Sequence, residues 1–481
     1  MVKSIDRSAR MGTESIGKLL WSFSWPAIVG MLVNSLYNIV SRIFVGHGIG
    51  TLAIAATVIA FPIMTIMFAF AMLIGIGATA LISIRLGENK KDEAEQIIGN
   101  AALLLIVLPL ILTIIYTLYS EQILIFFGAS AEVLPYAHDY TQIIMFGSVF
   151  GALSFGFNNF IRAQGNPKIA MLTNIFAAIT NIIFNYVFIF NLGWGLKGSA
   201  FATILSQFLT MLWVLGYFIL GYSELKFRLK YLKPKLSVTF MTMTIGFAPF
   251  GMHIAQSVQQ TILNRTLFSY GGDIAISAVG IIMSIGTILF MPIVGLSQGA
   301  QPIIGYNYGA NQYERVKETL KKAVLVGTVM ASIGYVFMLM YPYQMAQLFS
   351  PDDPAVVAMA AEALVIFFAL IPLVGFQIIC SNYFQAVGKP VQSIILSMSR
   401  QVLLFIPLLL ILPNFFGIYG VWYTAPIADI LSVLFTACFI FYEIRRFPKE
   451  DSVELEAFEA LPNETIDNFR RDDVVECQAS K

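Results

Sequence analysis

Charged side chains inside long apolar runs are the residues of this sequence best placed to do chemistry. Asp429 lies in the middle of APIADILSVL, Arg400 lies deep in SMSRQVLLF, and Asp139 and Glu362 lie a short way inside two other runs. A charge at the bilayer centre costs about 2.5–3.5 kcal/mol on insertion scales, so it faces a bundle or a cavity and finds a partner. All four are candidates for a proton or cation relay. A purely structural ion pair between Arg400 and Asp429 fits those two residues equally well. For Asp139 and Glu362, the favoured interpretation is that their side chains snorkel to the outer membrane interface.

Uncharged polar side chains gather on single faces of three apolar runs. The candidate substrate ligands on these faces are Asn34, Asn38, Ser41, Asn181, Asn185, His253, Gln256 and Gln259. Amides in hydrocarbon need partners, and interhelical hydrogen bonds worth about 0.6 kcal/mol each would satisfy them. A cavity lined by amides would satisfy them as well and would accept varied ligands. Three such faces favour the cavity.

The common catalytic and metal-binding motifs are missing from the sequence. It has no GxxxxGK[ST] loop for ATP, no HExxH, and only three cysteines, at 380, 438 and 477. We therefore expect no metal site, no cofactor and no enzymatic activity, and an ion gradient as the energy source. A channel would need a filter motif or a ring of charges, and neither is visible. The net charge of +1 offers no field that would attract nucleic acid.

Composition and apolar run length predict an all-α membrane protein. Hydrophobic residues make up 58% of the chain and charged residues 12%, against about 25% charged in soluble domains. A spanning helix needs about 20 apolar residues. Twelve candidate runs meet that need: 19–45, 51–82, 97–119, 136–160, 168–191, 199–221, 238–268, 274–305, 320–342, 356–384, 391–412 and 417–444.

Basic residues fall in alternate connections and predict the topology. They gather in the N-terminus, in the loops after runs 2, 4, 8 and 10, in the central linker and after run 12, whereas Lys197 is the one base squarely in an opposite loop. The positive-inside rule then places both termini in the cytoplasm. The expected order is an N-terminus (1–18), an N-lobe (19–221), a linker (222–237), a C-lobe (238–446) and an acidic tail (447–481).

The two lobes repeat each other. NNFIRAQGNP at 158–167 corresponds to SNYFQAVGKP at 381–390, and Arg42 corresponds to Arg265. Because each lobe has six spans, both enter the membrane from the same side. They are therefore parallel six-helix bundles related by a pseudo-two-fold axis along the membrane normal, an arrangement used by transporters that rock around a central site.

Several separated segments agree in order and spacing with those of a known family. They include PAIVGMLVNSLYNIVSRIFVGHG, RLGENKKDEAEQ, NNFIRAQGNP, GAQPIIGYNYGANQYERVKE and GIYGVWYTAPIADILS. Through them the sequence resembles the multidrug and toxic compound extrusion (MATE) family over about residues 15–446, most closely the bacterial branch of the staphylococcal multidrug exporter. The resemblance implies an alternating-access antiporter in the bacterial cytoplasmic membrane. It would export organic cations and drugs against proton or sodium influx, with membrane lipids as its other partners and a monomer as the expected state.

Two departures from the family pattern bear on coupling. Relatives often carry aspartate where this chain has Ser41 and Asn185, and neither residue here can titrate. Coupling in the N-lobe is therefore in doubt, and Asp429 becomes the better candidate. The alternative function is a flippase of lipid-linked sugars from the same superfamily. It would need more positive charge in its cleft than Arg42, Arg265 and Arg400 supply. A major-facilitator exporter is third, because its usual loop motif after run 2 is absent.

Overall fold

The computed structural model describes residues 7–49, 51–349 and 353–447, without the side chains at 38, 39, 42, 43, 45–49, 51–55 and 273. The described chain is almost wholly helical and contains no β-strand. By length and composition, eleven of its helices can cross a membrane, and a bent helix pair brings the number of spans to twelve. This confirms the all-α fold class and the twelve predicted runs, whose ends differ from those of the observed helices by up to seven residues.

The first half of the chain supplies six spans. Its elements are α1 (Arg10–Thr13), α2 (Ile16–Ile49), α3 (Thr51–Gly87), α4 (Lys91–Phe126), α5 (Leu134–Ala163), α6 (Pro167–Tyr186), the π-helix η1 (Val187–Asn191), α7 (Gly195–Ile219) and the 3-10 turn η2 (Leu229–Tyr231). We call α2–α7 the N-lobe. Pro26, Pro62 and Pro109 lie inside helices, which membrane helices tolerate where neighbours satisfy the freed carbonyl groups.

The second half supplies the other six, with more breaks. Its elements are α8 (Leu236–Gly309), α9 (Tyr313–Met340), α10 (Pro342–Gln347), α11 (Pro354–Phe367), α12 (Ile371–Ala386), α13 (Pro390–Met398), the π-helix η3 (Ser399–Phe405), α14 (Ile406–Ile411), α15 (Pro413–Phe416) and α16 (Ile418–Arg445). We call α8–α16 the C-lobe. Helix α8 makes two spans because Gly272 breaks it at φ 63°. Helices α11 and α12 meet at 56° and form the bent span.

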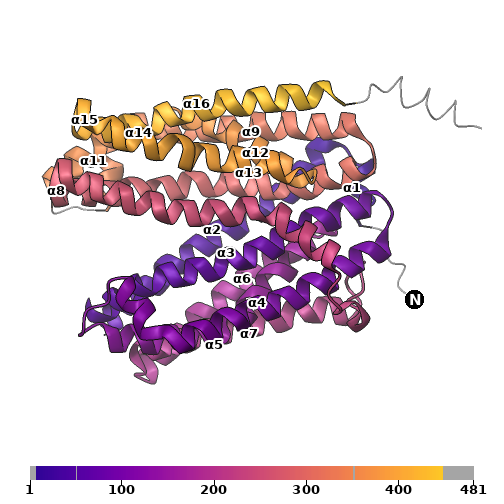
Figure 1. The fold of residues 1–481 in the computed structure, drawn as a ribbon, viewed down its shortest axis with the longest axis horizontal. Helices are drawn as coiled ribbons and strands as arrows, with labels where there is room; N and C mark the ends of the chain where they lie inside the picture. Colours follow the sequence, from indigo (N-terminus) through magenta and orange to yellow (C-terminus); the bar gives the residue numbers. More distant parts are fainter. Residues whose placement is uncertain (1–6, 50, 350–352, 448–481) are drawn as a thin grey trace, which may run out of the picture. The chain divides into compact units, whose positions relative to one another are not determined.

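The helices pack as two bundles, which Figure 1 shows on either side of the junction between α3 and α8. In the N-lobe, α5 packs on α3, α4 and α7, and α2 packs on α6. In the C-lobe, α8 packs on α9, α11 and α13, and α9 packs on α12. Helices α2 and α3 lie against α8 and make most of the contact between the lobes.

Backbone geometry repeats between the lobes. Asn89 and Asn311, which are 222 positions apart, are the non-glycine residues with positive φ in the described chain, and both have φ 59°. Gly195 and Gly417 repeat in the same way, at 56° and 58°. Both residue types tolerate this left-handed region better than others do. The duplication seen in the sequence therefore extends to the turns that connect the helices.

From Cys438 on, the end of α16 forms a separate unit. Within it, Arg445 lies over the ring of Phe441, 4.0 Å from the centroid, and Arg446 lies over Tyr442 at 4.2 Å. Such cation–π contacts at a helix end shield charge while keeping it near water.

Candidate functional site

The two lobes make close contacts near the ends of their helices on the side of the 222–236 linker, which we call the linker end. There Gly87 of α3 lies against the backbone of Tyr306 and Ala310, and Gly309 of α8 lies against the backbone of Ile84. Glycine permits this approach because it has no Cβ atom. The lobes are therefore sealed together by backbone contact at this end.

A polar contact adds to the closure at the linker end. Nη1 of Arg162 in α5 donates to Oε1 of Gln298 in α8 at 2.5 Å, and the Arg162 side chain is buried. Within the C-lobe, Asn382 of α12 donates to Ser297, the residue before Gln298 in α8, at 2.7 Å. In the sequence analysis, Arg162 is one of the basic residues assigned to the loop after run 4 (136–160). No local pattern could reveal this contact, because the partner lies 136 positions away.

The N-terminal segment also bridges the lobes, which the sequence did not predict. Ser8 donates from its hydroxyl group to Glu224 just after the N-lobe, at 2.9 Å. Arg315 of α9 donates to the carbonyl oxygens of Met11 and Glu14, at 2.9 and 2.6 Å. Met11 is fully buried. At the edge of the segment, a hydrogen bond from Arg10 holds the pKa of the Glu14 carboxyl below its usual value.

An ion pair between a half-buried arginine and a buried carboxylate joins two helices of the C-lobe. Nε of Arg400 lies 2.6 Å from Oδ1 of Asp429, whose side chain is almost fully enclosed, with 3% of the residue exposed. Arg400 lies in the π-helix η3, and such departures from α-helical geometry occur frequently at functional sites. The equivalent N-lobe positions hold Ala177 and Gln207, so the pair has no charged counterpart there.

The predicted amides of α6 are buried and bonded to each other. Asn185 donates to Oδ1 of Asn181 at 2.8 Å, and Asn181 donates to Ser206 of α7 at 3.3 Å. Their spacing of four residues makes them neighbours on one helical face. The structure thus places both inside the N-lobe and not on an open surface. A substrate could reach them only if the α6–α7 contact opened.

Several other predicted ligands are accessible. Asn34 and Gln256 are exposed, and Ser41, His253 and Gln259 are half-buried. The ring of His253 meets Phe68 of α3 edge-to-face at 5.8 Å, so it lies at the contact between the lobes. Oε1 of Gln259 is buried without a hydrogen-bond partner among the described residues, which leaves an acceptor for a donor group on a ligand. The Asn38 side chain lies outside the described residues.

Asp139 and Glu362 bond to helices that neighbour them within their own lobes. Oδ2 of Asp139 lies 3.0 Å from Nζ of Lys197, and the hydroxyl group of Tyr419 donates to Oε1 of Glu362 at 2.9 Å. Both are thus held by side chains of α7 and α16, a role the snorkelling interpretation did not include. Arg400 and Asp429 are the one pair among the four predicted relay residues that the structure brings together.

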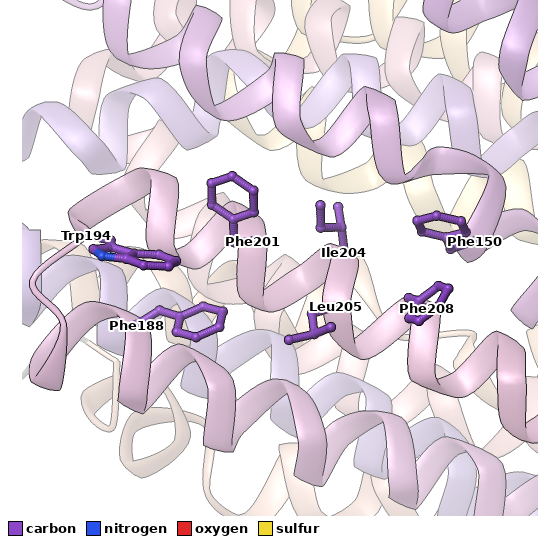
Figure 2. A pocket seen from close by; sticks show the side chains of 7 residues that line it. All are labelled: Phe150, Phe188, Trp194, Phe201, Ile204, Leu205 and Phe208. Atoms are coloured by element: carbon purple, nitrogen blue, oxygen red, sulfur yellow. The ribbon is translucent and has the colours of Figure 1, made fainter.

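Each lobe also contains a hollow. The larger one, of about 740 Å³, lies in the C-lobe between α10, α11 and α16 and includes Glu362. The smaller one, of about 220 Å³, lies in the N-lobe and is apolar throughout (Figure 2). Its lining residues are Phe150, Phe188, Trp194, Phe201, Ile204, Leu205 and Phe208.

Comparisons with known proteins agree with this architecture. The MatE family pattern matches residues 26–187 and 249–411, one stretch in each half. The chain is 30% identical to the multidrug export protein MepA of Staphylococcus haemolyticus, over 92% of this chain and 97% of that protein. It is 28% identical to MepA of Staphylococcus aureus strain NCTC 8325, over 91% and 96%.

Solved structures show the same fold. One is the MATE multidrug transporter DinF-BH, whose structure was determined as a complex with a ligand. Its sequence is 38% identical to this one, and the two structures match with a TM-score of 0.84 over 90% of this chain and 96% of that one. An outward-facing multidrug resistance MATE family transporter of the MOP superfamily is 22% identical. Its TM-score is 0.87 over 92% of this chain and 99% of that one.

Proposed function

This chain belongs to the MatE family, and we propose that it is a secondary active multidrug exporter that moves small organic cations and drugs in exchange for protons or sodium ions. The observation that carries the proposal is its match to multidrug export proteins along nearly their whole length. The likeness to the multidrug transporter DinF-BH adds to it. The family consists of multi-pass membrane transporters, and we place this one in a bacterial cytoplasmic membrane with both termini in the cytoplasm.

The closed linker end supports alternating access. If the linker is cytoplasmic, as its lysines favour, the backbone contacts of Gly87 and Gly309 close the cytoplasmic side of the junction between the lobes. Substrate would then leave on the opposite side, and rocking of the lobes would open the linker end for the next load. Asn34, Ser41, His253, Gln256 and Gln259 would contact substrate at this junction, while Asn181 and Asn185 would support the α6–α7 wall.

The Arg400–Asp429 pair is the proposed coupling site. A carboxylate held out of water needs a positive partner, and removal of the arginine leaves an uncompensated buried charge. When a movement of η3 withdraws Arg400, a proton or a sodium ion would take its place on Asp429. Return of the arginine would then release that ion. Asp139 and Glu362 are less suited to this exchange because both are more exposed.

The test is export from drug-loaded proteoliposomes, with a proton gradient or a sodium gradient imposed separately. We expect one of the two gradients to drive efflux above the rate seen with no gradient. Equal efflux under all three conditions would show that the chain is not an antiporter for these ions.

A further inference from the structure

Each lobe has one hydrogen-bonded contact between a carboxylate and the first turn of its last helix, and the two contacts differ in charge. Asp139 and Glu362 are 223 positions apart and occupy equivalent helices, α5 and α11. Their partners Lys197 and Tyr419 are 222 positions apart and begin the equivalent helices α7 and α16. In each lobe, a carboxylate thus reaches across to the first turn of the last helix. The N-lobe meets it with an ammonium group and the C-lobe with a neutral phenol.

This difference leaves one carboxylate without a counter-charge. Lys197 both bonds to Asp139 and neutralises it. Tyr419 satisfies one oxygen of Glu362 and supplies no positive charge. Among the described residues, no lysine, arginine or histidine lies within 4.0 Å of Glu362. An ionised glutamate here attracts a cation from outside the chain.

The space beside Glu362 suits a cation with an organic body. The hollow of about 740 Å³ is lined there by the side chains of Tyr343, Met359, Tyr419 and Trp422. Its volume lies within the roughly 300–1,000 Å³ typical of drug-sized ligands. Tyr343 and Tyr419 are 58% and 42% exposed, so their rings are open to a ligand, whereas Trp422 is 2% exposed and closes one wall.

Aromatic faces and a carboxylate together recognise organic cations. The ring quadrupole attracts a positive charge within about 6 Å of the centroid, and this attraction strengthens when the charge is desolvated. Met359 adds a flexible, polarisable surface that adapts to differing shapes. A small hydrated ion would gain little from such walls. The apolar N-lobe hollow in Figure 2 lacks the charged group and offers no such selectivity.

We propose that the hollow between α10, α11 and α16 binds aromatic organic cations. The positive charge of the ligand would pair with Glu362 as Lys197 pairs with Asp139 in the N-lobe. The site lies within the C-lobe, apart from the contact between α2, α3 and α8. Binding there requires no ion gradient and no movement of the lobes. The site is additional to the junction between the lobes, while its ligand class is that of the proposed export function, on which the inference rests in this respect.

The experiment measures tetraphenylphosphonium binding to the purified full chain by equilibrium dialysis in the uncharged detergent dodecyl maltoside. Glu362→Gln removes the charge, and Tyr419→Lys installs the lysine of the N-lobe beside it. We expect each variant to lose one bound cation per chain, or to bind it at least about tenfold more weakly, equivalent to about 1.4 kcal/mol. Asp139→Asn, the repeat-equivalent control, should bind as the wild type does.

A neutral ligand of similar shape, triphenylphosphine oxide, should bind equally to the wild type, Glu362→Gln and Asp139→Asn, because these substitutions change charge and keep the aromatic walls. Tyr419→Lys also removes one ring, so it should bind the neutral ligand somewhat more weakly but lose much more of its affinity for the cation. Unchanged tetraphenylphosphonium binding by Glu362→Gln and Tyr419→Lys would overturn the proposal. If Glu362→Gln does not fold, Tyr419→Lys decides the matter alone, since it keeps the carboxylate. Gradient-driven export is measured on the same preparations, so loss of the cation site and absence of export are distinguished.

Discussion

Gly77 and Gly299, which are 222 positions apart, meet the opposite lobe in the same way. Gly77 of α3 faces the backbone of Thr242 and Gly246 in α8, and Gly299 of α8 faces the backbone of Ser24 in α2. Ser24 and Gly246 are themselves 222 positions apart, so each contact is the image of the other. The pseudo-two-fold axis thus passes through a junction built from small residues, which lets helices approach as far as their backbones allow.

A methyl group at either glycine should force the lobes apart. Gly77→Ala and Gly299→Ala place a Cβ atom against backbone that cannot rotate away. We expect each to cost about 1–3 kcal/mol of stability, as overpacking generally does, and to lower the rate of drug export. Thermal unfolding of the purified protein and efflux from proteoliposomes would measure both effects.

Gly280→Ala is the matched control for this pair. Gly280 also lies in α8, but a Cβ atom there meets nothing within 4 Å. Alanine at this position should leave the stability of the protein unchanged, or raise it by about 0.5–1 kcal/mol because alanine favours the helix more than glycine does. If all three variants unfold at the same temperature, the glycines at the junction do not set the approach of the lobes.

Removal of Arg315 should loosen the N-terminal segment. Its guanidinium group donates to the carbonyl oxygens of Met11 and Glu14 and to Oδ1 of Asn307. Arg315→Ala would leave the carbonyl oxygen of Glu14 and Oδ1 of Asn307 without this donor, at a cost of about 1–3 kcal/mol, whereas the carbonyl oxygen of Met11 keeps its hydrogen bond from Nδ2 of Asn307. Faster proteolysis after Arg7 or Arg10 would report the release. Lys322→Ala, which breaks the exposed pair with Glu318, should cost about 0–1 kcal/mol and leave cleavage unchanged.

Much of the fold could be predicted from the sequence because it depends on local patterns. Apolar run length identified the twelve spans, and repeated motifs identified the duplication. The pairing of Arg400 with Asp429 follows from helical rise, since both residues lie at a similar distance from the turn at Asn414–Phe416. These features need no knowledge of how distant segments pack.

The rest depends on contacts between segments that are far apart in the chain. The buried Arg162 side chain and the N-terminal bridge could not be predicted, because their partners lie more than a hundred positions away. The amides Asn181 and Asn185 fit a cleft face and an internal hydrogen bond equally well, since the spacing of four residues produces either. Only the position of Ser206 on α7 distinguishes the two arrangements.

Gln256 and Asn181 should respond differently to alanine. Gln256 is exposed on α8, so Gln256→Ala should leave unfolding within about 0.5 kcal/mol of the wild type and weaken drug binding at the junction. Asn181 is buried and bonded to Asn185 and Ser206, so its loss should cost about 1–3 kcal/mol by leaving partners unsatisfied. Drug affinity and thermal unfolding are measured on both. Equal loss of affinity without loss of stability would return Asn181 to the list of direct ligands.

The orientation in the membrane can be tested at the exposed linker. Lys230 lies in the 3-10 turn η2 with its side chain over the ring of Tyr231. A cysteine at 230, in a chain whose three native cysteines are replaced, should resist a membrane-impermeant maleimide in intact cells and react after lysis. A cysteine in place of Lys197, at the opposite end of the N-lobe, should react in intact cells. The reverse pattern would invert the proposed topology.

Asp429→Asn tests whether the ion pair couples transport or only holds the C-lobe together. The substitution removes the charge and keeps an oxygen near Nε of Arg400, 2.6 Å away in the wild type. If the pair is a coupling site, the variant should fold, bind drug with unchanged affinity and lose gradient-driven export, because asparagine cannot exchange the arginine for a proton or a sodium ion. If the pair is only structural, breaking its charge should cost about 3–5 kcal/mol while the remaining folded protein exports as before. Arg400→Gln combined with Asp429→Asn separates these further. Removing both charges should restore stability in either case, but it restores export only if the pair has no part in coupling.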